Sequence, residues 1–262
     1  MFNMERIVRV KSLDEAYELN QDRTNVVVGG FMWMKMANRS IQSAIDLSGL
    51  GLDTIEETAD EYRIGCMCSL RTLELHDGIH REFNGALRHA LEHIVGVQFR
   101  NGATVGGSVY GRFGFSDVTA CLLALDTWVE LHKGGLVTLD DFLKMKANND
   151  ILVRVIIRRD GRNASYQSQR ITKTDFPVIA VSVALKDDKV YVSVGARPGK
   201  ATLVVRDAAD LGNRSLEALR AFSEALGGEI AYGKDMRGGA DYRKALAAVY
   251  IQRGLTDILG GE

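Results

Sequence analysis

Two glycine-rich corners, far apart in the chain, constrain the fold of this sequence more than any other feature. The first is Gly29-Gly30, which directly follows the β-branched run at 25–28. The second lies within FRNGATVGGSVYGRFGFSD at 99–117, which contains five glycines and no proline. Glycine allows backbone N–H groups to approach and hold an anion such as a diphosphate, although either corner taken alone is more simply a tight turn. The presence of both corners in one chain needs a common explanation.

Composition places the chain among ordinary soluble globular proteins. Its 262 residues are 46% apolar and 26% charged, enough for one large domain or two smaller ones. The net charge is -1 and the 33 basic residues are spread along the chain, which argues against a nucleic-acid interface. The apolar runs are too short to span a bilayer, and the start lacks the apolar core of a secretory signal. Three cysteines make no disulfide framework and favour a reducing cytoplasm.

Hydrophobic periodicity and turn residues predict a mixture of strands and helices. Ser12 and Glu15 fit a capping box that opens a helix. A hairpin is predicted where 177–185 and 189–194 flank Lys186-Asp187-Asp188. This order favours an α+β fold over a regular βαβ array. We expect strands at 6–10, 25–28, 41–47, 61–66, 127–131 and 151–158, helices at 69–76, 82–95, 216–226 and 242–251, and a helical or buried segment at 118–125.

The pattern changes beyond Asp160-Gly161, where hairpin and amphipathic-helix signals replace the earlier mixture. We therefore place a domain boundary near residue 160, with one domain at 1–160 and a second at 161–262.

Two short motifs are weak on inspection. Gly49 and Gly51 follow a predicted strand, but the third glycine of a dinucleotide-binding fingerprint is missing, so a turn is the better interpretation. An iron–sulfur cluster needs four thiolates, and the chain has three. Burial as small apolar side chains is the better interpretation of these cysteines, Cys66, Cys68 and Cys121.

A third motif, His89 to His93, matches the H-x-x-E-H pattern of inverted zinc proteases. Both histidines would lie on one helical face with Glu92 between them in sequence, one turn apart. That face is opposite the one formed by Leu87 and its apolar neighbours, and no third ligand is evident. We therefore expect a solvated polar face here and predict no metal site.

Four stretches in a fixed order carry a family resemblance that covers nearly the whole chain. They are VVVGGFMWMKM at 26–36, RIGCMCSLRTLE at 63–74, QFRNGATVGGS with the following SD at 98–117, and GADYRKALAAVYIQR at 239–253. Through these four stretches the chain resembles the FAD-binding (medium) subunit of molybdenum hydroxylases, the family of xanthine dehydrogenase and carbon monoxide dehydrogenase. Each motif is modest, and the ordered set is specific.

The resemblance implies an architecture. We expect a two-lobed FAD-binding domain of the p-cresol methylhydroxylase type at 1–160, with its lobes dividing near 55–60. A small α+β C-terminal domain of the carbon monoxide dehydrogenase flavoprotein type, a hairpin sheet plus helices, would follow at 161–262. In this family FAD lies extended between the lobes with its diphosphate on the two glycine loops.

By the same resemblance, cofactor-binding residues fall into three groups. Asp117 matches an aspartate that contacts the cofactor, Ile94 a position beside the flavin ring, and Leu152 a further apolar position. The first glycine loop comprises Val27, Val28, Gly29, Gly30, Phe31, Met32 and Trp33, and the second comprises Thr104, Gly106, Gly107 and Ser108.

The first loop departs from the family pattern. The family usually has Ala-Gly-Gly followed by small polar residues, whereas this chain has Val28-Gly29-Gly30 followed by Phe31, Met32 and Trp33. Backbone donors survive this change and side-chain hydroxyl donors do not. The bulky side chains would shield the ring edge or pack against a partner subunit. Ser108 stands where asparagine is common, and GRFGF replaces small residues before Ser116-Asp117.

The function implied is that of an electron-transfer subunit. Electrons would pass from iron–sulfur clusters in partner subunits through FAD to NAD or another acceptor, so no catalytic acid, base or nucleophile is assigned. The chain has no plausible cluster or molybdenum ligands, so a molybdenum-binding large subunit and an iron–sulfur small subunit are expected. Two alternatives remain open. A self-contained flavin oxidase would need a larger second domain, and a degenerate scaffold would keep the fold without retaining FAD.

Overall fold

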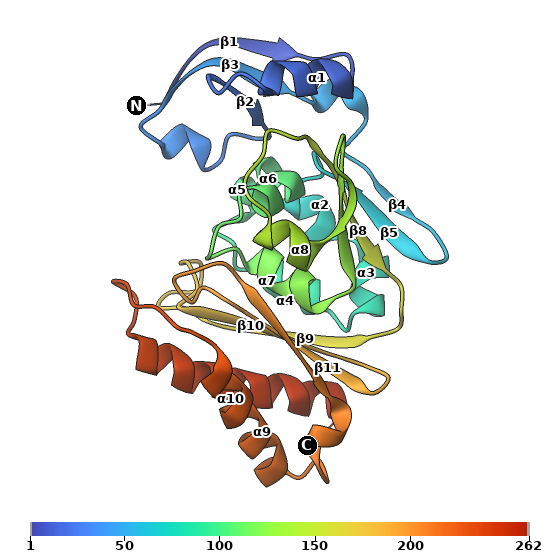
Figure 1. Cartoon of the computed structure of the whole chain (residues 1–262), viewed down its shortest axis with the longest axis vertical. Coiled ribbons are helices and arrows are strands. Elements are labelled where there is room, and N and C mark those ends of the chain that lie inside the picture. Colours follow the sequence, from blue (N-terminus) through green and yellow to red (C-terminus); the bar gives the residue numbers. More distant parts are fainter. Residues whose placement is uncertain (1, 261–262) are drawn as a thin grey trace.

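Three sheets follow one another along the long axis of the molecule (Figure 1). The computed structural model describes residues 2–260. A three-stranded sheet lies at the N-terminal end, a five-stranded sheet in the middle and a four-stranded sheet at the C-terminal end. The α+β prediction is confirmed, since strands and helices alternate irregularly and two of the three sheets are antiparallel.

The N-terminal lobe is a parallel sheet with strand order β1-β3-β2. A helix, α1, joins the first two strands in sequence. It begins after Ser12, whose Oγ accepts a hydrogen bond from the Glu15 N–H at 3.1 Å, the first half of the predicted capping box. The Glu15 carboxylate accepts from the Lys11 N–H at 2.7 Å in place of the Ser12 N–H. The elements are β1 (Asn3–Arg9), α1 (Leu13–Asn20), β2 (Asn25–Val28), the short 3-10 helix η1 (Met34–Met36), β3 (Ser40–Asp46) and η2 (Ser48–Leu50).

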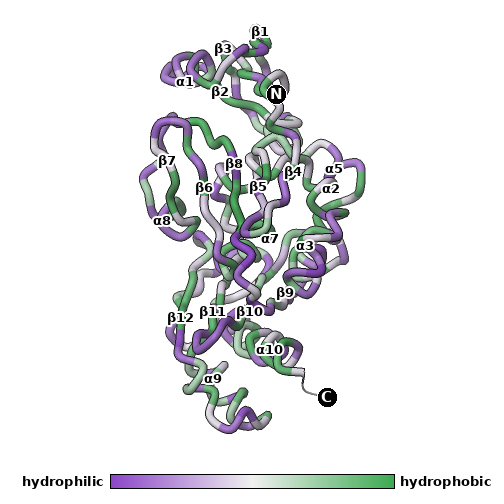
Figure 2. Tube along the Cα trace, turned by 90° about the vertical axis from the view of Figure 1, so that its right-hand side faces the viewer, coloured by the Kyte–Doolittle hydropathy of each residue, from purple (hydrophilic) through white to green (hydrophobic). Residues whose placement is uncertain are grey.

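The middle of the molecule is an antiparallel sheet of order β4-β5-β8-β6-β7 covered on one face by short helices. In β6, Thr127, Val129 and Leu131 point into the core while Trp128 and Glu130 face outward, the alternation expected of a half-buried strand. The central strand of this sheet, β8, is largely apolar (Figure 2). The strands are β4 (Ile55–Glu57), β5 (Glu61–Gly65), β6 (Thr127–Leu131), β7 (Gly135–Thr138) and β8 (Leu152–Arg158).

The helices of this middle part are short, and one of them, α7, is wholly buried. Every residue of α7 (Asp117–Ala124) is buried, because the helix lies between the middle sheet and the C-terminal sheet. The segment predicted as helical or buried is both. The other helices are α2 (Leu70–Glu74), α3 (Asp77–Glu82), α4 (Ala86–Leu91), α5 (Val97–Gly102), α6 (Val105–Tyr110) and α8 (Leu139–Lys144).

The C-terminal sheet has order β12-β11-β10-β9 and is covered on both faces. The predicted hairpin is confirmed, with Lys186 paired to Lys189. Successive side chains of β10 point to opposite faces of this sheet. Ile179, Val181 and Val183 pack against α9 and α10, whereas Ala180 and Ala184 belong to the core around α7. The elements are β9 (Asn163–Gln169), β10 (Ile179–Lys186), β11 (Lys189–Gly195), β12 (Thr202–Asp207), η3 (Ala208–Leu211), α9 (Leu216–Glu229) and α10 (Ala240–Leu259).

A fully buried cation, Arg243, fastens the first turn of α10. Its guanidinium donates to the carbonyl oxygens of Val178 at 2.8 Å and Gly238 at 2.5 Å, and to the Asp235 carboxylate at 2.6 Å. A buried charge needs such complete pairing to be tolerated. The arginine of the GADYR motif therefore ties the last helix to the start of β10.

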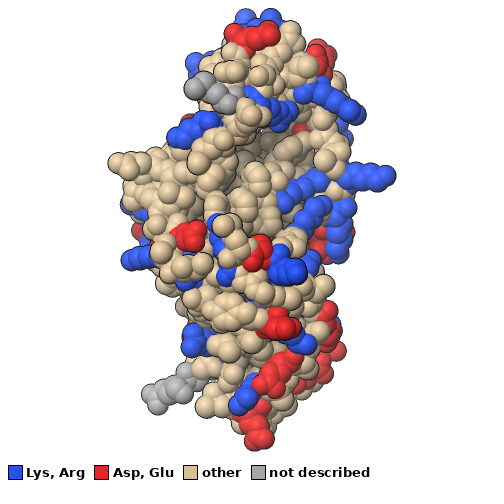
Figure 3. All heavy atoms as spheres, turned by 90° about the vertical axis from the view of Figure 1, so that its left-hand side faces the viewer, with Lys and Arg blue, Asp and Glu red and all other residues tan. Residues whose placement is uncertain are grey.

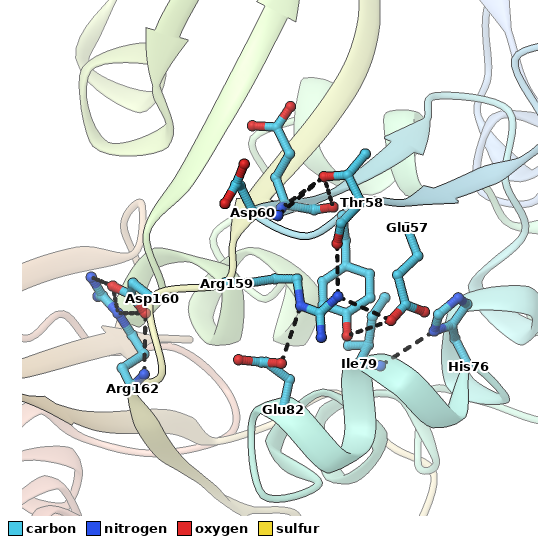
Figure 4. Close-up of polar contacts among 11 residues, drawn as sticks. Glu57, Thr58, Asp60, His76, Ile79, Glu82, Arg159, Asp160 and Arg162 are labelled. Atoms are coloured by element: carbon cyan, nitrogen blue, oxygen red, sulfur yellow. Dashed lines mark hydrogen bonds and ion pairs between the residues drawn. The ribbon is translucent and has the colours of Figure 1, made fainter.

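Arg159 fixes the point where the chain leaves the middle sheet (Figure 4). Its guanidinium donates to the carboxylates of Glu82 at 3.2 Å and Glu57 at 3.1 Å and to the Thr58 carbonyl oxygen at 2.7 Å. It also lies 5.0 Å from the centre of the Tyr62 ring. The β4–β5 hairpin, α3 and the end of β8 are thereby held together. The domain boundary near residue 160 and the lobe division near 55–60 stay predictions.

Two sequence-based expectations for local structure are wrong. The helix predicted at 82–95 is interrupted, because Asn84 (φ 51°) and Gly85 (φ 74°) take left-handed conformations between α3 and α4. The stretch at 99–117 was expected to form a glycine loop, but much of it is helical and forms α6 and the second half of α5.

Among the described residues, no helix combines the length and the apolar character that crossing a membrane requires.

Candidate cofactor site

The first glycine corner is a turn with unused backbone donors. Gly29-Gly30 ends β2, and Phe31 follows in a left-handed conformation (φ 59°) before η1 begins. Within residues 2–260, the backbone N–H groups of 29–33 donate to no protein acceptor. Successive free N–H groups in a turn that contains a left-handed residue are suited to hold an anion. This corner therefore offers unpaired backbone donors, and their contact with a cofactor stays a prediction.

The two glycine corners are in direct contact. A Cβ atom on Gly30 would lie 1.7 Å from the carbonyl oxygen of Gly102, and one on Gly29 would lie 2.5 Å from Oγ1 of Thr104. No real Cβ atom tolerates such distances, so both positions require glycine. The turn after β2 is thereby seated on the connection between α5 and α6.

The backbone of the second corner is already used within the protein. The N–H groups of Val105 and Gly106 donate to the carbonyl oxygens of Cys68 and Cys66, each at 2.9 Å, and the Gly107 N–H donates to Thr104 Oγ1 at 3.1 Å. A Cβ on Gly106 would lie 2.6 Å from the Cys66 carbonyl oxygen. The expectation that glycine leaves N–H groups free here is therefore wrong. A contact of these residues with the cofactor stays a prediction.

A small cavity of about 100 Å³ lies beside the turn. Four of the predicted residues line it, namely Trp33, Ile94, Ser108 and Asp117. The face of the molecule toward which α5 and α6 lie is hollowed beneath the N-terminal lobe, and uncharged atoms line the hollow (Figure 3). Apolar walls with a few convergent polar groups are typical of ligand sites.

Aromatic side chains from four separate segments fill the space next to this cavity. The Trp33 ring centre lies 4.9 Å from that of Phe99, 5.1 Å from that of Phe176 and 6.0 Å from that of Phe115. The Phe115 and Phe176 rings are 4.4 Å apart. Of this group only Trp33 was predicted as a site residue. Phe176 lies between β9 and β10, in a segment without any recognisable motif.

The polar wall of the cavity is a buried network around Asp117. Its Oδ1 accepts hydrogen bonds from the Tyr166 hydroxyl and, at 2.5 Å, from Arg170 Nη2. Burial raises the pKa of the Asp117 carboxyl although Arg170 opposes this, and burial raises the pKa of Tyr166 well above its usual value. Arg170 Nε is buried and has no partner among the described residues. An acceptor in the cavity would satisfy it, and no sequence motif marked this residue.

The remaining predicted residues lie around the turn or away from the cavity. Val27 and Val28 belong to β2, and the Phe31 ring packs 6.0 Å from that of Phe2. Met32 Cε contacts Gly102, at 2.3 Å from where a Cβ would stand. These bulky side chains thus pack within the chain. Leu152 is buried at the start of β8 and does not line the cavity.

The H-x-x-E-H segment does not present two histidines on one helical face. α4 ends at Leu91, so His93 lies beyond the helix, and that expectation is wrong. Oε1 of Glu92 lies 3.1 Å from His89 Nδ1 and 3.8 Å from His93 Nε2. Residues 2–260 contain no group of three His, Cys, Asp or Glu side chains that could hold a metal ion.

The three cysteines are free and buried, as predicted. Burial raises the pKa of the Cys66 and Cys121 thiols to about 12 and that of Cys68 to about 11. Thiols with such values stay protonated and unreactive at neutral pH.

Comparisons with known proteins agree on one family. Residues 2–159 match the family described as the FAD binding domain in molybdopterin dehydrogenase. The chain is 26% identical over 253 residues to the uncharacterised protein YgfM of Escherichia coli K12, covering 95% of this chain and 94% of that protein. It is 27% identical over 270 residues to the nicotine 6-hydroxylase medium subunit of Paenarthrobacter nicotinovorans, covering 94% of each.

Solved structures share the fold over almost the entire length. A chain of carbon monoxide dehydrogenase from Hydrogenophaga pseudoflava superimposes with a TM-score of 0.84 at 20% identity, covering 97% of both chains. A chain of quinoline 2-oxidoreductase from Pseudomonas putida 86 gives a TM-score of 0.84 at 18% identity, covering 99% of this chain and 97% of the other. The mixed α+β architecture is therefore the one found in these structures.

Proposed function

This chain belongs to the family of FAD-binding domains of molybdopterin dehydrogenases, and from this premise we propose that it is the FAD-binding electron-transfer subunit of a molybdenum hydroxylase-type dehydrogenase. In this role it receives electrons from iron–sulfur clusters of a partner subunit and passes them to NAD or another acceptor. The likeness to a medium subunit of nicotine 6-hydroxylase supports this assignment.

One observation carries the proposal: the turn at 29–33 has free backbone N–H groups and ends at Trp33, which lines an apolar cavity. The turn suits a diphosphate, which takes hydrogen bonds from such groups. The unpartnered Nε of Arg170 suits a further acceptor on the ligand. The residues present therefore fit FAD at its charged part, with the aromatic walls available to its planar part.

The residues of this chain bind, orient and shield, while bound FAD supplies the redox chemistry. The turn after β2 holds the diphosphate. Phe99, Phe115 and Phe176 offer apolar surfaces that exclude water from the cavity. Asp117 keeps Arg170 in place by a buried ion pair. No side chain is assigned as a catalytic acid or base.

The proposal requires partners. The described residues offer no cluster ligands, and the cysteines are buried and protonated. Iron–sulfur and molybdenum centres must therefore belong to other chains, a small and a large subunit. The free, reduced cysteines support a reducing compartment, which we take to be the cytoplasm.

The test is to purify the protein and measure its visible flavin absorption and the FAD released on denaturation. We expect about one FAD per chain, and copurification of molybdenum and iron–sulfur subunits when the proteins are produced together. A folded protein that neither contains nor binds FAD would establish the scaffold alternative. A flavoprotein that oxidises a substrate without partners would establish the oxidase alternative.

A matched pair of variants tests the location of the diphosphate. Met32→Asp places a carboxylate in the turn, and Met32→Asn has the same size without the charge. Repulsion of the diphosphate should weaken FAD binding of the aspartate variant by about tenfold or more relative to the asparagine variant. Equal dissociation constants for the two variants, measured by titration, would contradict the placement at this turn.

A further inference from the structure

Trp33 ends the turn at 29–33 and lines the cavity. It directly precedes η1, and its indole packs on Phe99 of α5, on Phe115 before α7 and on Phe176 between β9 and β10. Three aromatic rings, two tilted and one edge-on, thus converge on one ring that the chain itself provides. A planar ligand in place of the indole would meet the same three rings.

Tilted and edge-on ring contacts hold the indole. Within residues 2–260, the Trp33 Nε1–H donates to no acceptor, whereas that of Trp128, the other tryptophan, donates to Asp126 at 2.9 Å. The backbone around Trp33 is short 3-10 helix fixed by three local hydrogen bonds, of which the first joins Lys35 N–H to the Phe31 carbonyl oxygen. Few interactions therefore oppose an outward rotation of this side chain.

The cavity is too small for a flavin ring while the indole is in place. It measures about 100 Å³, whereas sites for ligands of this size typically enclose about 300–1,000 Å³. One wall is fixed, since α7 is wholly buried and Asp117 is paired with Tyr166 and Arg170. Trp33 lines the cavity without any hydrogen bond from its side chain to the described residues.

We infer that Trp33 is an internal competitor for the ring site: its indole occupies the space in which the planar ring of the cofactor stacks, and it turns out toward solvent when that ring binds. The inference rests on the proposed function. FAD binding then requires the three Trp33 ring contacts to be broken, so Trp33 sets the affinity of the chain for its cofactor.

Removing the indole is expected to tighten binding. Each aromatic pair contributes modestly, but three pairs together correspond to at least about a tenfold change in a dissociation constant. We therefore expect Trp33→Ala to bind FAD about tenfold or more tightly than the unmodified chain. Trp33→Phe, with a smaller ring, should lie between the two.

The experiment is a calorimetric titration of the deflavinated full-length protein with FAD. It compares the unmodified chain with Trp33→Ala, Trp33→Phe and the control Trp128→Ala, whose side chain lies on the outer face of the middle sheet. The control should leave the dissociation constant unchanged. Thermal unfolding of each variant verifies that it is folded. If Trp33→Ala does not fold, the comparison with Trp33→Phe still tests the inference.

A second measurement observes the indole directly. In Trp128→Phe protein labelled with 5-fluorotryptophan, a single fluorine resonance reports on position 33. FAD should move this resonance to a position sensitive to exchange of H2O for D2O, which indicates exposure to water. A resonance that stays protected from solvent in the FAD complex would overturn the inference.

The outcomes separate the inference from the proposed function. If the unmodified chain binds FAD as tightly as Trp33→Ala or more tightly, Trp33 is no competitor and the inference falls, while the proposed function stands. If neither Trp33→Ala nor the unmodified chain binds FAD, both fall. Tighter binding by Trp33→Ala with an exposed indole in the complex supports both.

Discussion

Replacing Gly30 by alanine tests the contact on which the site is built. The added Cβ would stand 1.7 Å from the Gly102 carbonyl oxygen and 2.5 Å from its carbonyl carbon. Because Cβ atoms essentially never approach closer than 3.0 Å, the turn and the end of α5 must separate by more than 1 Å. Both neighbours are backbone, so no side-chain rotation can relieve the clash.

The cost follows from what this separation breaks. Overpacking of this kind costs about 1–3 kcal/mol, and the tilted Trp33–Phe99 contact, with ring centres 4.9 Å apart, is pulled open as well. We expect the free energy of unfolding to fall by about 3 kcal/mol, which for a chain of this size corresponds to a decrease in Tm of about 6–12 °C.

The assay is thermal and urea unfolding of the full chain, with FAD retention measured in parallel. Gly96→Ala is the matched control, because a Cβ at that position meets no atom within 4 Å and its backbone is extended. The control should change the free energy of unfolding by less than about 0.5 kcal/mol. A Gly30→Ala protein with the Tm of the control would refute the contact between the two corners.

Two further predictions concern the surroundings of the site. Burial raises the pKa of the Glu74 carboxyl, but hydrogen bonds from Arg100 and Arg71 outweigh it and hold that pKa below its usual value of 4.5. Glu74→Gln should therefore cost about 3 kcal/mol at pH 7. Urea unfolding should show this difference shrink once the pH falls below 4.5 and vanish as it falls through the lowered pKa of the folded protein. Glu224→Gln, in an exposed pair, should cost less than about 0.5 kcal/mol. In the folded protein at pH 7, a thiol reagent should label none of the three buried cysteines, whereas urea-unfolded protein should react at Cys66, Cys68 and Cys121.

Local signals in the sequence predicted the parts of the fold that depend on neighbouring residues. Ser12 and Glu15 predicted the start of α1, and the Lys186-Asp187-Asp188 turn predicted the C-terminal hairpin. The β-branched run before Gly29-Gly30 predicted a strand that ends in a turn. In each case the physical cause lies within a few residues of the signal.

The parts that could not be predicted depend on contacts between distant segments. Arg170 and Phe176 enter the cavity because β9 and β10 pair across a long connection, and nothing in that connection distinguishes them in sequence. Glycine content in the second corner was also ambiguous, since the close approach of Cys66 already requires glycine at Gly106. Composition alone does not tell which neighbour a glycine makes room for.

The buried Arg243 links the far end of the chain to the cavity wall. It holds the Val178 carbonyl oxygen across 65 positions of sequence, directly after the segment that carries Arg170 and Phe176. A premature stop codon before α10 would remove this anchor and release that segment. A truncated gene product would then lose the shape of the proposed cofactor site through a change remote from every residue that lines the cavity.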